Sequence, residues 1–265
     1  MGNFFEEHHL HPGTVGEAAC VLEAVTERLL ATGHGGAAFA DIYSVITREV
    51  ERDTQAPDGA FLEPGWISRL AGRFCARYLD TLRFHAEGRA QDCEAWGIAY
   101  ELSDDERASP LRAVMLGLSA HINHDLAFGI HATILEFGHA DDPRMLARYL
   151  HDHDQVNALL CRSIPASFEH LIVRHRCRAS AIIWRCLRPL ARWGAMRMLR
   201  AWRARVWRDV LSLLAAQTDE ERGAVAQRIE RRAARAGWLL ALPGGRPSPA
   251  RAHDACSGRG PCADC

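Results

Sequence analysis

The segment AHINHDLAFGIH, from Ala120 to His131, places three histidines and one aspartate inside what is otherwise the pattern of a core helix. From Pro110 onward, apolar residues recur at the spacing of one buried helical stripe. At about 100° per residue, Asp125 falls inside this stripe and His121 lies at its edge, one turn earlier. A carboxylate on a buried face must be paired, hydrogen-bonded or metal-bound, because leaving it bare costs several kcal/mol. The segment therefore predicts a polar site inside a helical core.

The composition is that of a globular protein, with 48% hydrophobic and 25% charged residues in 265. All 32 basic residues are arginines, which excludes a Schiff-base lysine and a P-loop lysine. The near-zero net charge hides an asymmetry: residues 1–170 carry 26 acids and 13 arginines, whereas residues 171–265 carry 7 acids and 19 arginines. Residues 171–265 are therefore expected to contact either residues 1–170 or an anionic partner.

We expect a cytoplasmic location. The N-terminus is polar and acidic and does not resemble a signal peptide. No apolar run approaches the roughly 18 residues that a membrane span requires. The nine cysteines, most of them scattered through helical sequence, are typical of reduced thiols.

The periodicity predicts an all-α fold: a single multi-helix, bundle-like domain of about eight to ten helices over residues 14–242. Residues 1–13 and 243–265 are expected to be flexible tails, since the second has low complexity and little means of burying a core. No strand and no fixed-period repeat is recognised. Helices are expected over 14–31, 37–53, 65–87, 93–102, from Pro110 with Ser109 as cap, from Pro143 with Asp142 as cap, over 174–208 with a division at Pro189, and over 218–240.

Other polar residues share the inner faces of these helices. His153 and Asn157 lie one turn apart on the apolar face of the helix after Pro143, and His85 falls at the centre of the stripe of helix 65–87. Their neighbours His151, Asp152 and Asp154 are expected to point sideways or outward.

These residues form a candidate metal site. The expected ligands of a divalent metal ion, zinc or iron, are His121, Asp125, His153, His85 and His131. His131 can join only if the helix bends near Gly129, and His124 is expected to face away.

Asn157 and Asn123 are the candidate catalytic residues, with Asn157 orienting a ligand or a substrate. The alternative is a satisfied polar network, in which Asp125 bonds His121 or an arginine and His153 bonds Asn157.

The metal hypothesis predicts an enzyme that acts on a small molecule. The preferred reaction is hydrolysis of an ester or phosphoester by metal-activated water. One alternative is an iron-dependent oxidase or oxygenase that acts on a small metabolite. A second is a non-enzymatic helical binding protein whose polar pairs only support its core.

The spacing His121-x₃-Asp125-x₅-His131 resembles that of the zinc-dependent phospholipase C and P1-type nuclease superfamily. This resemblance implies an all-α enzyme with a trinuclear zinc site. The chain departs from the pattern of that superfamily, because it lacks the mature N-terminal Trp ligand. It also has His153 and Asn157 where the superfamily has a His followed four residues later by an acid.

A second resemblance covers roughly residues 37–160. The segments AFADIYSVITREV (38–50), RFCARYLDTL (73–82), AWGIAYE (95–101) and GLSAHINHDL (117–126) resemble an uncharacterised bacterial all-helical family of unknown function with an AHIN-x-DL signature. The resemblance implies an all-α fold with His121, Asn123 and Asp125 at the signature, and it implies no activity.

Three further motifs have alternative interpretations. Glu136-x-x-His139 has the form of half a di-iron motif, but its companions are absent. Residues 174–208 contain eleven arginines, four tryptophans and no acid. They are expected to cover the acidic N-terminal part or, alternatively, to meet a membrane surface; nucleic acid is not the expected partner. Three cysteines near the C-terminus, Cys256, Cys262 and Cys265, could bind a metal or form a disulfide.

Overall fold

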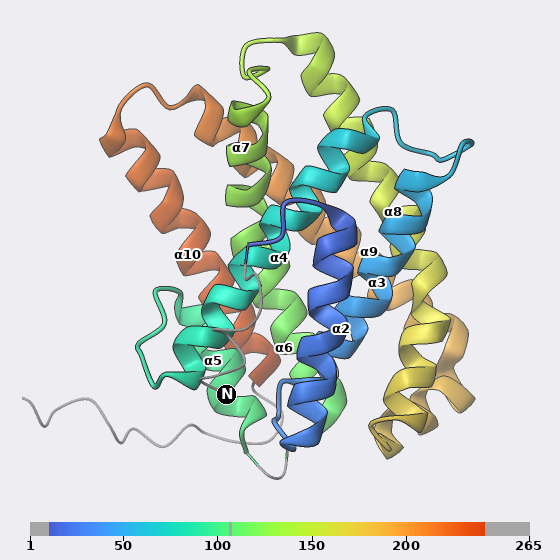
Figure 1. The fold of residues 1–265 in the computed structure, drawn as a ribbon. Coiled ribbons are helices and arrows are strands. Elements are labelled where there is room, and N and C mark those ends of the chain that lie inside the picture. Colours follow the sequence, from blue (N-terminus) through green and yellow to red (C-terminus); the bar gives the residue numbers. More distant parts are fainter. Residues whose placement is uncertain (1–10, 106–107, 242–265) are drawn as a thin grey trace, which may run out of the picture.

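The computed structural model describes residues 11–105 and 108–241, and within them every regular element is helical (Figure 1). The all-α prediction is confirmed. The elements are α2 (Val15–Ala31), α3 (Ala37–Gln55), α4 (Pro64–Ala86), α5 (Glu94–Ser103), α6 (Pro110–Ala120), the π-helix η1 (His121–Asp125), α7 (Leu126–Glu136), α8 (Pro143–Val173), α9 (Arg178–Ala215) and α10 (Asp219–Ala241).

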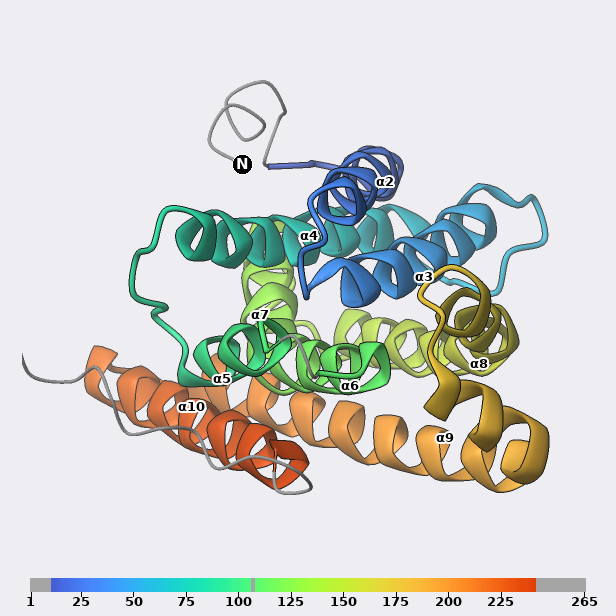
Figure 2. The ribbon, with the colours of Figure 1, turned by 90° about the horizontal axis from the view of Figure 1, so that it is seen from below.

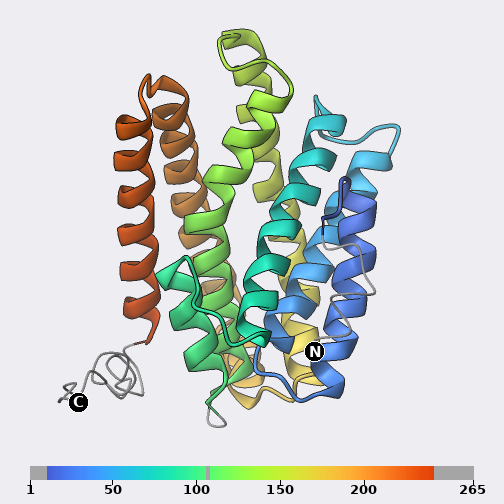
Figure 3. The same ribbon diagram turned by 60° about the vertical axis from the view of Figure 1, so that its left-hand side comes forward.

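The helices lie in layers (Figure 2). α2, α3 and α4 pack together on one side, and α9 and α10 lie on the other. Between them runs the continuous rod of α6, η1 and α7, with α5 and α8 beside it (Figure 3). The rod contacts both outer layers, so η1 lies in the middle of the molecule.

Local capping signals place several helix starts where the sequence predicts them. Thr14 accepts a hydrogen bond from the backbone N–H of Glu17, and Ser109 accepts one from that of Arg112. Asp142 caps α8 in the same way. Such side chains satisfy N–H groups that the first helical turn leaves without an intrahelical partner.

α9 bends where Pro189 predicts a division. Leu187, two residues earlier, leaves helical geometry with φ −129° and ψ 18°. Proline has no N–H to donate, and its ring crowds the preceding turn, so the helix cannot continue straight.

Of the expected N-terminal tail, the structure describes residues 11–13. Residues 11–13 lie against α4, where Gly72 allows close approach: a Cβ there would stand 2.6 Å from the carbonyl oxygen of Pro12. Residues 1–10 and 243–265, which make up the rest of the two expected tails, lie outside the described residues.

The helices in residues 11–105 and 108–241 do not include one with the combined length and hydropathy of a membrane span.

Candidate functional site

The site is built on η1, a wide turn inside the central rod. The N–H of Leu126 donates to the carbonyl of His121, five residues back, rather than four as in an α-helix. The prediction of one regular helix through this segment is therefore wrong at this turn. Single π-turns inside α-helices frequently occur at functional sites.

Asp125 is the buried centre of a hydrogen-bond network, with 1% of its surface exposed. Its Oδ2 accepts from Trp96 Nε1 and from His121 Nδ1, each at 2.9 Å. Its Oδ1 lies 2.9 Å from His124 Nδ1 and 3.6 Å from Arg77 Nε. Four donor groups thus surround the two carboxylate oxygens, which meets the buried acid's need for partners.

The two histidines of this network differ in their protonation state. Burial opposes ionisation of Asp125, but the hydrogen bonds from His121 and His124 outweigh it and hold the pKa of Asp125 well below its ordinary value. Burial lowers the pKa of His121 despite its bond to Asp125. Burial also disfavours the charged form of His124, but hydrogen bonds to Asp125, Cys93 and Glu230 raise the pKa of His124 to about 11. His121 is therefore neutral, and His124 is a cation between carboxylates.

The expectation that His124 faces away is wrong. Its Nδ1 meets Asp125, and its Nε2 lies 2.9 Å from Glu230 Oε2. The expectation assumed a regular helix, and the extra residue of the π-turn changes the direction of the side chains that follow it.

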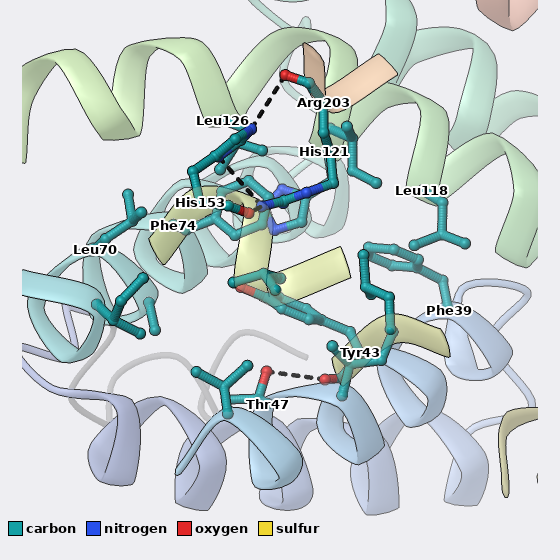
Figure 4. A pocket seen from close by; sticks show the side chains of 17 residues that line it. Phe39, Tyr43, Thr47, Leu70, Phe74, Leu118, His121, Leu126, His153 and Arg203 are labelled. Atoms are coloured by element: carbon teal, nitrogen blue, oxygen red, sulfur yellow. Dashed lines mark hydrogen bonds between the residues drawn. The ribbon is translucent and has the colours of Figure 1, made fainter. Parts of the chain in front are cut away.

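His121 is held on its other faces by aromatic rings. Its ring stacks on Phe74 with centroids 3.4 Å apart, and the edge of Tyr43 approaches with centroids 4.8 Å apart (Figure 4). His121 Nδ1 donates to Asp125, whereas Nε2 is buried and has no hydrogen-bond partner among the described residues.

His121 lines a cavity of about 100 Å³ between α3, α4, η1, α8 and α9. Figure 4 shows the polar groups His121, His153 and Arg203 among apolar walls. The apolar side chains include Phe39, Leu70, Phe74, Leu118 and Leu126.

His153 reaches the same cavity, but both of its ring nitrogens are already engaged. Nε2 donates to the carbonyl oxygen of Arg203 at 3.1 Å, and Nδ1 accepts from Arg203 Nη2 at 3.2 Å. Burial first, and then the Arg203 charge, lower the pKa of His153 well below its ordinary value. His153 is therefore a neutral imidazole paired with Arg203 rather than with Asn157.

Arg203 is a buried cation, with 5% of its surface exposed. Besides His153 Nδ1, its Nη2 bonds the His153 carbonyl, while its Nε has no partner in the described part of the chain. The charge of Asp154 favours the cationic form of Arg203, but no carboxylate of the described residues forms an ion pair with it. Burial lowers the pKa of Arg203 to about 10, so the group remains charged at neutral pH.

The structure does not bring the remaining candidate ligands to this cavity. His85 bonds Asp104 at 2.9 Å and stacks on Tyr100, so its predicted place in the inner site is wrong. His131 is half-buried and is not part of the cavity wall.

The candidate asparagines also lie outside the cavity wall. Asn123 donates to Ser119 Oγ at 3.2 Å. Asn157 Oδ1 is buried without a partner among the described residues. Neither side chain bonds His121 or His153.

Other polar residues have structural partners. Asp152, expected to point outward, is buried and accepts from the backbone N–H groups of Leu62 and Glu63 at 2.7 Å, because it caps the start of α4 from α8. Glu136 pairs with two arginines of α4, and His139 bonds Tyr149. The cysteines of the C-terminal motif lie outside the described residues.

The arginines of α9 do not cover the acidic N-terminal helices as expected. Within residues 174–208, the ion pairs to that region come from Arg174, which bonds Asp41 and Glu27, and from His175, which bonds Asp41. The first half of α9 instead exposes Ile182, Leu190 and Trp193, at 64%, 60% and 62%. A membrane surface as partner stays a prediction.

Sequence reasoning missed several members of the network. Trp96 and Glu230 come from other helices, and only packing brings them to η1. In the same way, packing alone brings Arg203 of α9 to the cavity beside His121. A signal was available for Trp96, because a buried indole N–H requires an acceptor and Asp125 was the buried acid without a known donor.

Comparison with known proteins identifies a family, and the function of that family is unknown. No curated protein and no solved structure matches the chain. The model of a family of unknown function, DUF5995, matches residues 15–243, which is nearly all of the helical domain described above. The chain belongs to this family of unknown function.

Proposed function

We propose that this chain is a hydrolase that cleaves an ester of a small, mainly apolar molecule in the cavity beside His121. The observation that carries the proposal is the buried, unpartnered Nε2 of a histidine whose other nitrogen is held by a carboxylate. A carboxylate on Nδ1 selects the tautomer that leaves the Nε2 lone pair free to accept a proton.

In this mechanism His121 is the general base. Its Nε2 takes a proton from a water molecule while the water oxygen bonds to the carbonyl carbon of the ester, and the carbonyl electron pair moves to the carbonyl oxygen. When that pair returns, the bond to the alcohol oxygen breaks. The leaving oxygen takes the proton from His121, so the base is regenerated and an acid and an alcohol are released.

Arg203 suits the electrostatic part of this reaction. A fixed cation in an apolar site stabilises the negative charge that develops on the carbonyl oxygen, and afterwards it stabilises the carboxylate product. A buried guanidinium that is opposed by the charge of Asp154 but forms no ion pair among the described residues is costly for the fold, and an anionic ligand would offset that cost.

The cavity limits the substrate. Its volume of about 100 Å³ is smaller than the roughly 150 Å³ of an apolar cavity that holds benzene. An acyl group of a few carbons would fit between Phe39, Leu70 and Leu126.

The proposal retains hydrolysis but uses a protein base at the cavity instead of a metal ion. Of the five side chains expected as ligands, His121 alone both lines the cavity and has a ring nitrogen without a partner among the described residues. Both nitrogens of His153 and both oxygens of Asp125 are engaged.

The test is hydrolysis of para-nitrophenyl esters from acetate to octanoate. We expect turnover of the short esters, a fall in kcat of about 10²–10⁴-fold in His121→Gln, and a fall of about 10²–10³-fold in Arg203→Met. The control is His139→Gln, because His139 bonds Tyr149 away from the cavity. Circular dichroism and Tm identify variants that fail to fold. Absence of turnover across the series, or full activity in folded His121→Gln, would overturn the proposal.

A second candidate is a binding protein for a short-chain carboxylate, favoured by the buried charge of Arg203 and by its Nε, which has no hydrogen-bond partner among the described residues. It predicts calorimetric binding of butyrate or hexanoate that Arg203→Met abolishes, without turnover of any ester. Turnover that depends on His121 would rule out a role in binding alone.

A further inference from the structure

A second group of side chains lies on the opposite side of Asp125 from His121. It consists of Cys93, which precedes the first turn of α5, His124 of η1 and Glu230 of α10. One sulfur, one nitrogen and one oxygen from these residues all lie within 4.8 Å of one another. Three chain segments thus bring a thiol, an imidazole and a carboxylate to one point.

Each of the two outer ligands is oriented by a second hydrogen bond. His124 Nδ1 bonds Asp125, which turns Nε2 toward Glu230. Glu230 Oε1 accepts from the backbone N–H of Glu94 at 2.7 Å, which turns Oε2 toward His124. A metal-bound histidine typically donates its other N–H to a carboxylate in this way, and ligating carboxylates are themselves hydrogen-bonded.

The site is sheltered without being closed. Cys93 is 4% exposed, whereas the side chains of His124 and Glu230 are 12% and 28% exposed. An ion can therefore reach the three donors from the Glu230 side, while the thiol stays protected from solvent.

We propose that Cys93, His124 and Glu230 bind a zinc ion. Thiolate, imidazole and carboxylate are the ligands that Zn²⁺ takes in proteins, and three protein ligands leave a fourth tetrahedral position for water. The ion replaces the proton between His124 and Glu230, and its charge takes over the stabilisation of Asp125.

A second cluster, His34, His85 and Asp104, provides an internal comparison. Its donor atoms are also within 4.8 Å of one another. It has no thiol, Asp104 is 43% exposed, and His34 Nδ1 already accepts from the N–H of Gly36. Zinc prefers the Cys93 site because a buried thiolate is the stronger ligand.

The test is metal binding by the full chain, first stripped with a chelator. We expect one Zn²⁺ per chain by calorimetry, and Co²⁺ in its place should show thiolate-to-cobalt charge-transfer absorption. Cys93→Ser should abolish that absorption and lower Zn²⁺ affinity by more than the roughly 10–100-fold cost of losing a supporting residue. Glu230→Gln should also lower the affinity.

Cys75→Ser and His85→Gln are the matched controls. Cys75 is buried but does not belong to either cluster of metal-ligating side chains, and His85 belongs to the other one. Both variants should retain the ion and its absorption. Absence of Zn²⁺ binding, binding unchanged in Cys93→Ser, or loss in His85→Gln would overturn the proposal.

The outcome of the zinc-binding test does not depend on the proposed esterase activity. The readouts are metal content and absorption, and His121→Gln should retain both. Failure of the esterase therefore leaves the zinc site standing, and failure of zinc binding leaves the esterase standing.

Discussion

Two buried aspartates, Asp41 and Asp125, are both surrounded by histidine and arginine. The remaining polar atoms of these partners, however, lie in different surroundings. Asp41 joins α3 to the end of α8 through His170, His175 and Arg174. The side chains of His170 and Arg174 are 36% and 34% exposed, so water can satisfy their remaining polar groups. This cluster has the form of a structural clamp.

Beside Asp125, Arg77 reaches solvent, with 37% of its side chain exposed, but the two histidine partners do not, at 2% and 12%. The Nε2 atom of His121, a residue that lines the cavity, is buried and has no hydrogen-bond partner among the described residues. The Nε2 atom of His124 pairs with Glu230 Oε2 close to Cys93. A buried polar atom without a partner requires an explanation in a native structure, whereas a satisfied clamp does not. Around a buried acid, polar atoms that remain without partners are therefore a stronger sign of a functional site than the acid itself.

The largest effect should come from Asp125→Ala, which removes the acceptor from Trp96, His121 and His124 together. We expect a loss of about 3–5 kcal/mol in the free energy of unfolding, because the charge of His124 remains buried with only Glu230 opposite. Urea denaturation measures it. Asp41→Ala is the matched control and should cost less, since His170 and Arg174 reach solvent and His175 alone of its three partners is buried. An equal or larger cost would remove the contrast.

Gly117→Ala tests the packing behind His121. A Cβ at Gly117 would stand 2.5 Å from the ring of Phe39, which lies against His121 and lines the cavity. Overpacking of this kind costs about 1–3 kcal/mol. In Gly129→Ala, by contrast, the Cβ meets Leu70 at an ordinary 3.6 Å, so the thermal transition should not fall. Equal stability of the two variants would show that the wall is not tightly packed.

The pH dependence of the unfolding free energy tests the contribution of the Asp41 clamp. The hydrogen bonds from His175 and His170 outweigh burial and hold the pKa of Asp41 below its ordinary value of 3.8. The folded state then binds fewer protons than the unfolded state, so the stabilisation is complete above pH 3.8 and is lost as the pH falls through the folded pKa. Asp41→Asn should flatten the acid limb of unfolding free energy against pH, with Arg174 still paired to Glu27. An unchanged acid limb would contradict the clamp.

The smallest effect should be a gain. Gly97 follows Trp96 in α5, and a Cβ there meets nothing within 4 Å. Gly97→Ala should raise the unfolding free energy by about 0.5–1 kcal/mol, because alanine loses less backbone freedom in a helix. Tm and indole fluorescence measure the result, and a loss of stability would mean that α5 must deform to hold the Trp96–Asp125 bond.

The sequence could predict what depends on neighbours along the chain. The all-α class, the caps at Thr14 and Ser109, and the break before Pro189 follow from helical periodicity and local backbone chemistry. The burial of His121 and Asp125 also follows from periodicity, because an apolar stripe must face the core.

The tertiary structure alone decided which partners these residues meet. A π-turn adds one residue and brings His124 to Asp125, and no period of 3.6 predicts it. Cys93 and Glu230 reach η1 from distant segments because helices α5 and α10 pack together. Sequence spacing determines which residues share a face of a helix, but helix packing determines what that face meets.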